Sequence, residues 1–224
     1  MYLSDIILPR YCPVCGRVLL RKENYLCLHC LADLPYSYFW SYRGNAAELS
    51  LEGKISVDKA ASLLIYRENS PCSKIVQAFK YKHRTGLCRY MGDMLGGKLA
   101  ESGWAKGYDY IIPVPLHPLK RWVRGYNQAE IISRALGARL EIPVLKDQLV
   151  RRRYTTSQTR KNAAERLSGM EGAFRLRKRG FFEGKSLLLV DDVMTTGATL
   201  VSCANEILKM DNCRIGIVTL AFAE

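Results

Sequence analysis

The sequence contains no hydrophobic run that approaches the ~18 residues needed to span a bilayer. Its first residues, MYLSDIILPRYC, include Asp5 and have no basic stretch ahead of their short apolar run, which argues against a secretory signal peptide. The chain also lacks a G-x-x-x-x-G-K-[ST] loop, which excludes a P-loop ATPase. These absences predict a cytoplasmic protein that is not inserted into a membrane.

Acidic residues are scarce relative to basic ones. The 224 residues include 34 lysines and arginines against 21 aspartates and glutamates, a formal net charge of +13. The excess is concentrated in residues 119–180, which carry 16 basic and 5 acidic side chains. Such a segment indicates phosphate-bearing partners, either small molecules or nucleic acid, although a merely solvated surface would have the same composition.

Four of the eight cysteines form two C-x-x-C pairs, CPVC and CLHC, separated by eleven residues. Two such pairs can bring four thiolates into a tetrahedron around Zn²⁺, as in a closed structural site. Iron in a rubredoxin-like site is the alternative metal, whereas two disulfides are disfavoured in the cytoplasm. Gly16 follows the first pair, where a positive φ would turn backbone amides toward the sulfurs. The predicted ligands are Cys12, Cys15, Cys27 and Cys30.

An aromatic segment, PYSYFWSY at residues 35–42, follows the cysteine pairs. It could stack against single-stranded bases, but aromatic clusters of this kind more often dock a small module onto its neighbour, and docking is the prediction here. The polar residues 41–56 are interpreted as a connection. The chain is therefore divided into a zinc ribbon with its docking segment, residues 1–45, and a larger domain, residues 59–224.

Strand and helix patterns alternate through the larger domain. Strands are predicted at 61–66, 108–115, 187–193 and 214–222, with short candidates near 142–145 and 172–176. Helices are predicted at 73–82, 89–102, 127–140 and 198–210. This alternation predicts an α/β fold with a mostly parallel sheet flanked by helices on both faces.

The stretch LLLVDDVMTTGAT, residues 187–199, carries the most chemistry. Four apolar residues indicate a strand buried on both faces, so Asp191 and Asp192 fall where that strand surfaces, the place where open α/β sheets bind ligands. The following loop supplies hydroxyls, a glycine and a helix N-terminus, which together suit a phosphate dianion. The carboxylates can accept hydrogen bonds from a ribose diol. A ribose 5-phosphate therefore fits this stretch.

These thirteen residues resemble the phosphoribosyl pyrophosphate (PRPP) motif of type I phosphoribosyltransferases. The wider layout is an N-terminal four-cysteine module, then PVPLHPLKRWVRGYNQAE, then a basic stretch ending in GAF, then the PRPP motif. This layout resembles the ComF/GntX family over nearly the whole chain. The resemblance implies a type I phosphoribosyltransferase-like parallel sheet flanked by helices, preceded by a small four-cysteine zinc ribbon.

The resemblance also implies roles for particular residues. Asp191 and Asp192 would be the catalytic pair, holding the ribose diol and helping to place Mg²⁺ with PRPP. The phosphate loop would be formed by Val193, Met194, Thr195, Thr196, Gly197, Ala198 and Thr199. A turn at 113–117 would hold pyrophosphate, and the implied binding residues there and just after it are Pro115, Leu116, His117, Lys120, Arg121 and Arg124. In the basic stretch 151–166, which matches a mobile loop, the implied phosphate contacts are Arg153, Gln158 and Arg166.

Three positions leave alternatives open. His117 is interpreted equally well as a turn residue or as a ligand contact. The basic residues Lys80, Lys82, His83 and Arg84 are either a helix end stabilised by the macrodipole or a ligand contact. Gly169 stands where family members often have Asn five residues before the Phe of GAF, which weakens any role for that position.

Two functions follow from the resemblance. One is a PRPP-binding protein acting in DNA uptake and natural transformation, with single-stranded DNA as a partner and a DNA-processing protein or helicase recruited through the zinc ribbon. The other is an active, amidophosphoribosyltransferase-like enzyme of nucleotide metabolism that transfers ribose 5-phosphate and releases pyrophosphate. The DNA function is preferred, because salvage enzymes rarely need a cysteine-rich module.

Overall fold

The computed structural model describes residues 9–81, 84–151 and 173–224. Its central sheet has four parallel strands in the order β1-β6-β5-β2. These strands are β1 (Lys59–Tyr66), β2 (Tyr110–Pro113), β5 (Ser186–Met194) and β6 (Arg214–Ala223). A separate antiparallel pair is formed by β3 (Leu149–Arg151) and β4 (Phe174–Leu176).

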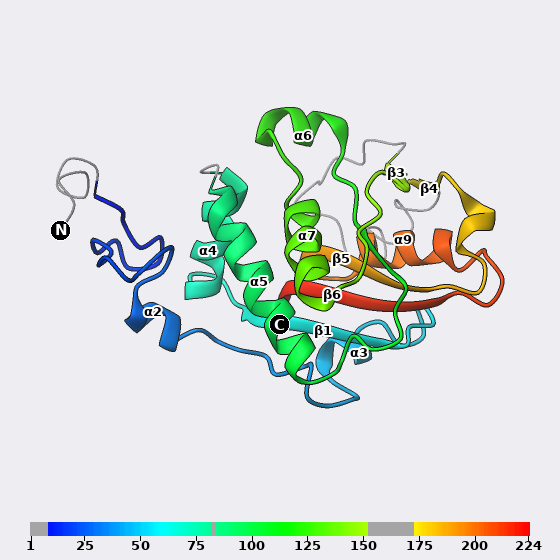
Figure 1. The fold of residues 1–224 in the computed structure, drawn as a ribbon, viewed down its shortest axis with the longest axis horizontal. Helices are drawn as coiled ribbons and strands as arrows, with labels where there is room; N and C mark the ends of the chain where they lie inside the picture. Colours follow the sequence, from blue (N-terminus) through cyan, green and yellow to red (C-terminus); the bar gives the residue numbers. More distant parts are fainter. Residues whose placement is uncertain (1–8, 82–83, 152–172) are drawn as a thin grey trace.

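Helices surround this sheet (Figure 1). Their bounds are α2 (Leu28–Ala32), α3 (Ala46–Leu49), α4 (Pro71–Tyr81), α5 (Thr85–Glu101), α6 (Pro118–Arg124), α7 (Gln128–Leu140) and α9 (Ala198–Ile207), with a 3₁₀ turn at Arg179–Phe182. The predicted helix at 198–210 thus ends at Ile207, and those predicted at 73–82 and 89–102 begin earlier than expected. The type I phosphoribosyltransferase-like arrangement, a parallel sheet flanked by helices behind a four-cysteine module, is confirmed.

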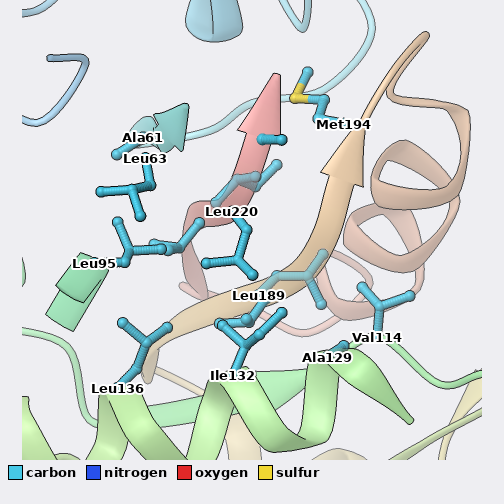
Figure 2. Packing of buried hydrophobic residues seen from close by; sticks show 14 of the residues in the cluster. Ala61, Leu63, Leu95, Val114, Ala129, Ile132, Leu136, Leu189, Met194 and Leu220 are labelled. Carbon is cyan, nitrogen blue, oxygen red and sulfur yellow. The ribbon is translucent and has the colours of Figure 1, made fainter. Parts of the chain in front are cut away.

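The main core lies between the sheet and the helices α5 and α7. Leu189 of β5 points toward Ile132 and Leu136 of α7, and Leu95 of α5 fills the same layer (Figure 2). These four side chains have no exposed surface. The sequence predicted that the apolar run in β5 is buried on both faces of the strand, and the structure covers both faces.

Helices α5 and α7 approach each other unusually closely because α5 carries glycines at the contact. A Cβ placed on Gly92 would lie 3.0 Å from Cβ of Ala135 and 3.1 Å from Cα of Ile132. Gly96, one turn later, faces Arg139 in the same way. The packing of α7, and with it the loop that precedes it, therefore depends on small residues in α5.

The aromatic segment docks onto the sheet as predicted. Phe39 and Trp40 are buried, and the Phe39 ring lies 5.6 Å from that of Phe222 on β6. Ser37 N–H donates to the carbonyl of Leu63 over 3.0 Å, and Tyr36 forms an isolated antiparallel bridge with Leu64. The segment thus runs along the outer edge of β1.

One of the two short strand predictions was misplaced, whereas the candidate at 172–176 contains β4. Within the described part of the chain, residues 142–145 form only one bridge, between Val144 and Ile111 of β2, because Pro143 has no N–H to continue the ladder. The pairing partner of β4 is instead Leu149–Arg151. The connection predicted at 41–56 contains α3, whose N-cap Asn45 is buried and accepts hydrogen bonds from the N–H groups of Ala47 and Glu48.

Candidate functional site

The acidic pair lies within the last four residues of β5, not just beyond its end. Strand β2 stops at Pro113, whose partner is Val190, so among the described residues β5 continues past this point with no neighbouring strand on that side. Asp191 and Asp192 therefore border an opening between β5 and the segment that follows β2. Both carboxylates are half-buried, and each accepts the N–H of the next residue, over 2.8 Å for Asp191 and 2.7 Å for Asp192.

The phosphate loop follows directly. Gly197 adopts a φ of 73° and is the N-cap of α9, a conformation that side-chain-bearing residues rarely take. Thr195 is exposed, Thr196 and Thr199 are half-buried, and Met194, Gly197 and Ala198 are buried. The described residues provide no side-chain cap for α9, so its first N–H groups remain suited to an anion, as the sequence predicts.

Several cations surround the acidic pair. Lys80, in the last turn of α4, forms an ion pair with Asp192, with 3.1 Å between Nζ and Oδ2. The pKa of Lys120 on α6 is lowered by burial and then by the positive charges of Arg151, Arg124 and Lys80, whereas Asp192 acts in the opposite direction. Segments from α4, α6 and β3 thus bring positive charge to one place.

The pKa of Asp191 is raised to about 7. Loss of water around the carboxyl group is the largest cause, and the charge of Asp192 adds to it. The N–H of Asp192 and the charges of Lys80 and Arg151 act in the opposite direction without cancelling the rise. Two adjacent carboxylates therefore share a site in which one of them readily holds a proton near neutral pH.

The predicted pyrophosphate turn is the connection from β2 to α6. Val114 N–H donates to the carbonyl of Val190 over 2.8 Å, and Pro115, Leu116 and His117 follow, all half-buried. His117 caps α6, since its Nδ1 accepts the N–H of Leu119 over 3.2 Å. Its pKa is lowered, first by burial and then by Arg151 and Lys120. His117 thus serves as a turn residue beside the cationic cluster.

The three predicted basic residues, which the structure places on α6, do not all lie in one cluster. Lys120 and Arg124 belong to the positive charges near Asp192, and Arg124 also lies 5.5 Å from the ring centre of Tyr81. Arg121 is exposed and lies 3.8 Å from Glu130 of α7, which places it beside a different part of the molecule. The other predicted phosphate contacts, Arg153, Gln158 and Arg166, lie outside the described residues.

Sequence reasoning left Lys80 open between a helix end and a ligand contact, and it did not single out Arg151 as a site residue. The structure places Lys80 at the site, because it lies four residues after Val76 on the buried side of α4, with only 20% of its side chain exposed. Arg151 closes β3, and its guanidinium lies 5.4 Å from the centre of the Phe174 ring. Its position is set by the β3-β4 pair, which the sequence did not reveal.

The four predicted cysteine ligands lie together at the other end of the molecule. Their sulfurs all lie within 4.8 Å of one another, and Sγ of Cys15 and Cys27 are 3.7 Å apart. Tetrahedral Zn–S bonds of about 2.3 Å place two sulfurs about 3.8 Å apart, whereas a disulfide requires about 2.05 Å. All eight cysteines are free. The cluster could therefore hold a metal ion.

The backbone around Cys12 favours a thiolate there. Burial raises the pKa of Cys12, but N–H groups of Cys15, Cys27 and Val14 outweigh it and lower the pKa to about 7, whereas burial and the neighbouring cysteines raise the pKa of Cys30. Gly16 has a φ of 77°, as the sequence predicts, and donates its N–H to the carbonyl of Cys12 over 2.9 Å. Glu23 is buried behind the cluster and accepts the N–H groups of Leu20 and Leu28, each over 2.7 Å, as well as a bond from Arg17.

Known proteins are similar to this chain over most of its length. The family model of the phosphoribosyl transferase domain matches residues 123–224. Competence protein F of Haemophilus influenzae is 34% identical over 188 residues, which cover 82% of this chain and 77% of that protein. The chain belongs to the ComF family. DNA utilization protein YhgH of Escherichia coli is 25% identical over 201 residues, covering 88% of this chain and 84% of the relative.

Solved structures give a weaker likeness to this ComF-family chain. A purine phosphoribosyltransferase from Pyrococcus horikoshii is 24% identical, with a TM-score of 0.38, and the match covers 59% of this chain and 74% of that one. Among the residues that the structure describes, no helix combines the length and apolar character needed to cross a bilayer.

Proposed function

We propose that this protein binds PRPP, or a related phosphoribosyl ligand, together with Mg²⁺ at the carboxyl end of β5. The observation that carries the proposal is the half-buried pair Asp191 and Asp192, which lies beside the N-terminus of α9 and its N–H groups. Lys80 forms an ion pair with Asp192 at the same place. The two carboxylates would accept hydrogen bonds from the 2′ and 3′ hydroxyls of the ribose. N–H groups and hydroxyls of residues 195–199 would hold the 5′-phosphate.

Charges around the pair suit the rest of the ligand. Lys80, Lys120 and Arg151 would face the negative charge of the pyrophosphate group. Mg²⁺ would supply further neutralisation of the phosphate oxygens, as it does when bound with phosphorylated substrates. In a transfer reaction, ionisation at the anomeric carbon would build positive charge on the ribose ring and negative charge on departing pyrophosphate, so positioning and charge would provide most of the catalysis.

We further propose that the PRPP site serves a protein of DNA uptake and natural transformation. Support comes from the names of the relatives, a competence protein and a DNA utilization protein, and from the excess of +11 in residues 119–180. Single-stranded DNA is the proposed macromolecular partner, since basic surfaces bind phosphates without requiring a sequence. A DNA-processing protein or helicase would be recruited through the cysteine module.

The metal of the cysteine module is proposed to be structural Zn²⁺. Four thiolates with sulfur separations near those of a tetrahedral zinc site fit the donor set. Protein purified without added metal should contain about one equivalent of zinc per chain. A metal-free protein with four reactive thiols and an unchanged fold would contradict this assignment.

Calorimetric titration of PRPP with Mg²⁺ tests the ligand site. Wild-type protein should give saturable binding, and the Asp191→Ala/Asp192→Ala variant should lose it. A matched control is Glu183→Ala/Asp211→Ala. It also removes two acidic side chains, but from exposed positions just before the amino-terminal ends of β5 and β6. Absence of PRPP binding in wild type, or equal loss in the control, would overturn the proposal. Pyrophosphate release with candidate bases or ammonia would show whether binding leads to turnover.

A further inference from the structure

A groove with a volume of about 710 Å³ lies along the seam between α5 and α7. One wall includes Tyr25 of the cysteine module, and one end is formed by the segment that joins α6 to α7. Figure 1 shows α5 and α7 side by side with α6 beyond the end of α7. Among the described residues, neither the acidic pair nor Lys80 or Lys120 lines this groove, so it is separate from the PRPP site.

Tyrosines and arginines dominate the large side chains of the groove. They are Tyr25, Arg89, Tyr90, Arg121, Tyr126 and Arg134. They come from the cysteine module, α5, α6, the α6–α7 loop and α7, and the rings of Tyr25 and Tyr90 lie 5.5 Å apart. Phenol rings interleaved with guanidinium groups are the combination that holds a nucleic-acid strand, because bases stack on the rings and phosphates meet the cations.

The two acidic side chains of the groove are already paired with arginines. Asp93 accepts two hydrogen bonds from Arg139, over 2.6 and 2.8 Å, and Glu130 lies 2.7 Å from Arg134. Arg89 is exposed and has no hydrogen bond or ion pair within the described part of the chain. Arg121 and Arg134 both face Glu130, so the three arginines of the groove exceed its two acidic side chains by one positive charge, and Arg89 offers that charge to an anionic ligand.

The shape of the groove favours a strand over a peptide helix or a single nucleotide. Along α7 its lining runs from the N-cap Asn127 to Ala138, eleven residue steps, which correspond to about 16 Å at 1.5 Å per step. That length matches about four or five nucleotides at a spacing of ~3.4 Å. Apart from Ile131, its aliphatic lining is alanine, which offers no pockets for the large anchors of an amphipathic helix.

We propose that the groove between α5 and α7 binds single-stranded DNA, with its arginines on the phosphates and its tyrosines against the bases. This inference rests on the proposed function in DNA uptake and assigns the DNA to a place distinct from the PRPP site. Because Tyr25 belongs to the cysteine module, DNA would contact both the module and the helices. The module would then be needed for DNA binding but not for PRPP binding.

Fluorescence anisotropy of a labelled oligothymidylate of about 20 nucleotides, titrated with full-length protein, tests the inference. The variant Arg89→Gln/Arg134→Gln removes two guanidinium groups while keeping good helix formers. DNA binding should weaken at least tenfold, and the slope of log K against log salt should fall by about 1.4, or 0.7 per lost contact. The control Lys106→Gln/Lys146→Gln removes the same charge from exposed positions outside the groove and should change binding less than about twofold.

Each failure has a separate meaning. Equal weakening in variant and control would show binding by general charge and overturn the groove assignment, as would an unchanged affinity in the groove variant. Thymidine monophosphate that competes as well as the oligonucleotide would overturn the assignment to a strand. PRPP titrations on the same variants should match wild type. A wild type that binds PRPP but no DNA would overturn this inference and leave the PRPP site standing.

A second variant tests the aromatic part. Tyr25→Leu keeps an apolar side chain against Gly86 of α5 but removes the π surface. Stacking of one base contributes about 1–3 kcal/mol, so the affinity for oligothymidylate should fall about fivefold or more. The slope of log K against log salt should stay unchanged, because no charge is removed. Tyr25→Phe should restore binding. Failure of phenylalanine to restore it would contradict a stacking role.

Discussion

Two neighbouring half-buried carboxylates destabilise the fold when both are charged, because the charges repel each other and have lost water. In the Asp191–Asp192 pair, an ion pair at one carboxylate and a raised pKa at the other reduce this repulsion. Lys80 pairs with Asp192, and Asp191 has its pKa raised to about 7. The ligand-free site therefore holds a proton that a diol and a cation would displace. Ligand binding near neutral pH should release protons for this reason.

Replacing Asp191 by Asn should reveal the stability cost of the buried charge. Because the pKa in the folded protein, about 7, exceeds the ordinary 3.8, the folded state binds a proton that the unfolded chain has released. This contribution to stability is complete below about pH 4 and is lost as pH rises through about 7. A three-unit rise corresponds to at most about 4 kcal/mol, and partial exposure reduces this to about 2 kcal/mol.

Urea unfolding of the zinc-loaded protein without Mg²⁺ or PRPP, with and without Asp191→Asn, measures this effect. Relative to wild type, the variant should gain about 2 kcal/mol of unfolding free energy between about pH 4 and pH 8. A difference between the two proteins that stays constant across this range would contradict the assigned pKa.

Glu23 is the second residue with a sharp expected effect. It accepts two backbone N–H groups and a bond from Arg17 behind the cysteine cluster, and these contacts lower its pKa. Glu23→Gln should lower zinc affinity by about tenfold, as is typical when a partner behind the ligands is lost. Competition with a chromogenic zinc chelator measures it. Unchanged affinity would mean that the four cysteines alone set the geometry.

At the scale of elements, hydrophobic periodicity predicted the long helices and β5 but missed α6. Helix α6 has no buried residue, and Leu119, Trp122 and Val123 are 57%, 84% and 71% exposed. Its signals are local: a capping His117, Pro118 at the first position and Gly125 with a φ of 76° at the end. Capping chemistry, not periodicity, would have found it.

The sequence predicted the part of the candidate site that lies in one contiguous segment, left Lys80 open between a helix end and a ligand contact, and missed Arg151. Residues 187–199 specify a strand, an acidic pair and a helix start within one segment, so their order alone indicates the site. Lys80 and Arg151 reach it from α4 and β3. Their arrival depends on which helices cover the sheet and on the β3-β4 pair, and neither is encoded in a local motif.

The contact between α5 and α7 gives a matched pair of substitutions in one helix. Gly92→Ala would press a methyl group to within 3.0 Å of Ala135 and 3.1 Å of backbone in α7. Unfolding free energy should fall by about 1–3 kcal/mol despite the better helix propensity of Ala. Gly97→Ala, on the same helix with nothing within 4 Å, should raise it by roughly 0.5–1 kcal/mol.

Chemical denaturation of the two variants measures both signs. Equal effects of the two substitutions would show that the helices can separate freely, contrary to the close packing described. The Gly97→Ala variant also controls for any general change in the stability of α5.

At the scale of the whole molecule, the aromatic segment belongs structurally with the sheet, because Phe39 and Trp40 are buried. A chain beginning at Leu34 keeps these contacts, whereas a chain beginning at Ala46 loses them and also the buried cap Asn45. Loss of two buried aromatic side chains costs about 3–5 kcal/mol each, which is comparable with the total stability of a domain.

Thermal unfolding of the two truncated chains should separate them clearly. The chain that begins at Leu34 should unfold cooperatively and bind PRPP, while the chain that begins at Ala46 should be unfolded or strongly destabilised. Equal stability of the two would show that residues 34–45 contribute nothing to the core. The predicted boundary at residue 45 would then be the appropriate one for dissection.

Each outer strand of the sheet pairs along its outer side through one isolated bridge: Tyr36 with Leu64 on β1, and Val144 with Ile111 on β2. An open parallel sheet without such covers offers unpaired N–H and carbonyl groups to any extended chain nearby. The aromatic segment, residues 35–42, which connects the cysteine module to the sheet, should therefore also reduce self-association through the outer side of β1. Damage to that segment should therefore appear as turbidity in a concentrated solution, in addition to the loss of stability expected for the chain that begins at Ala46.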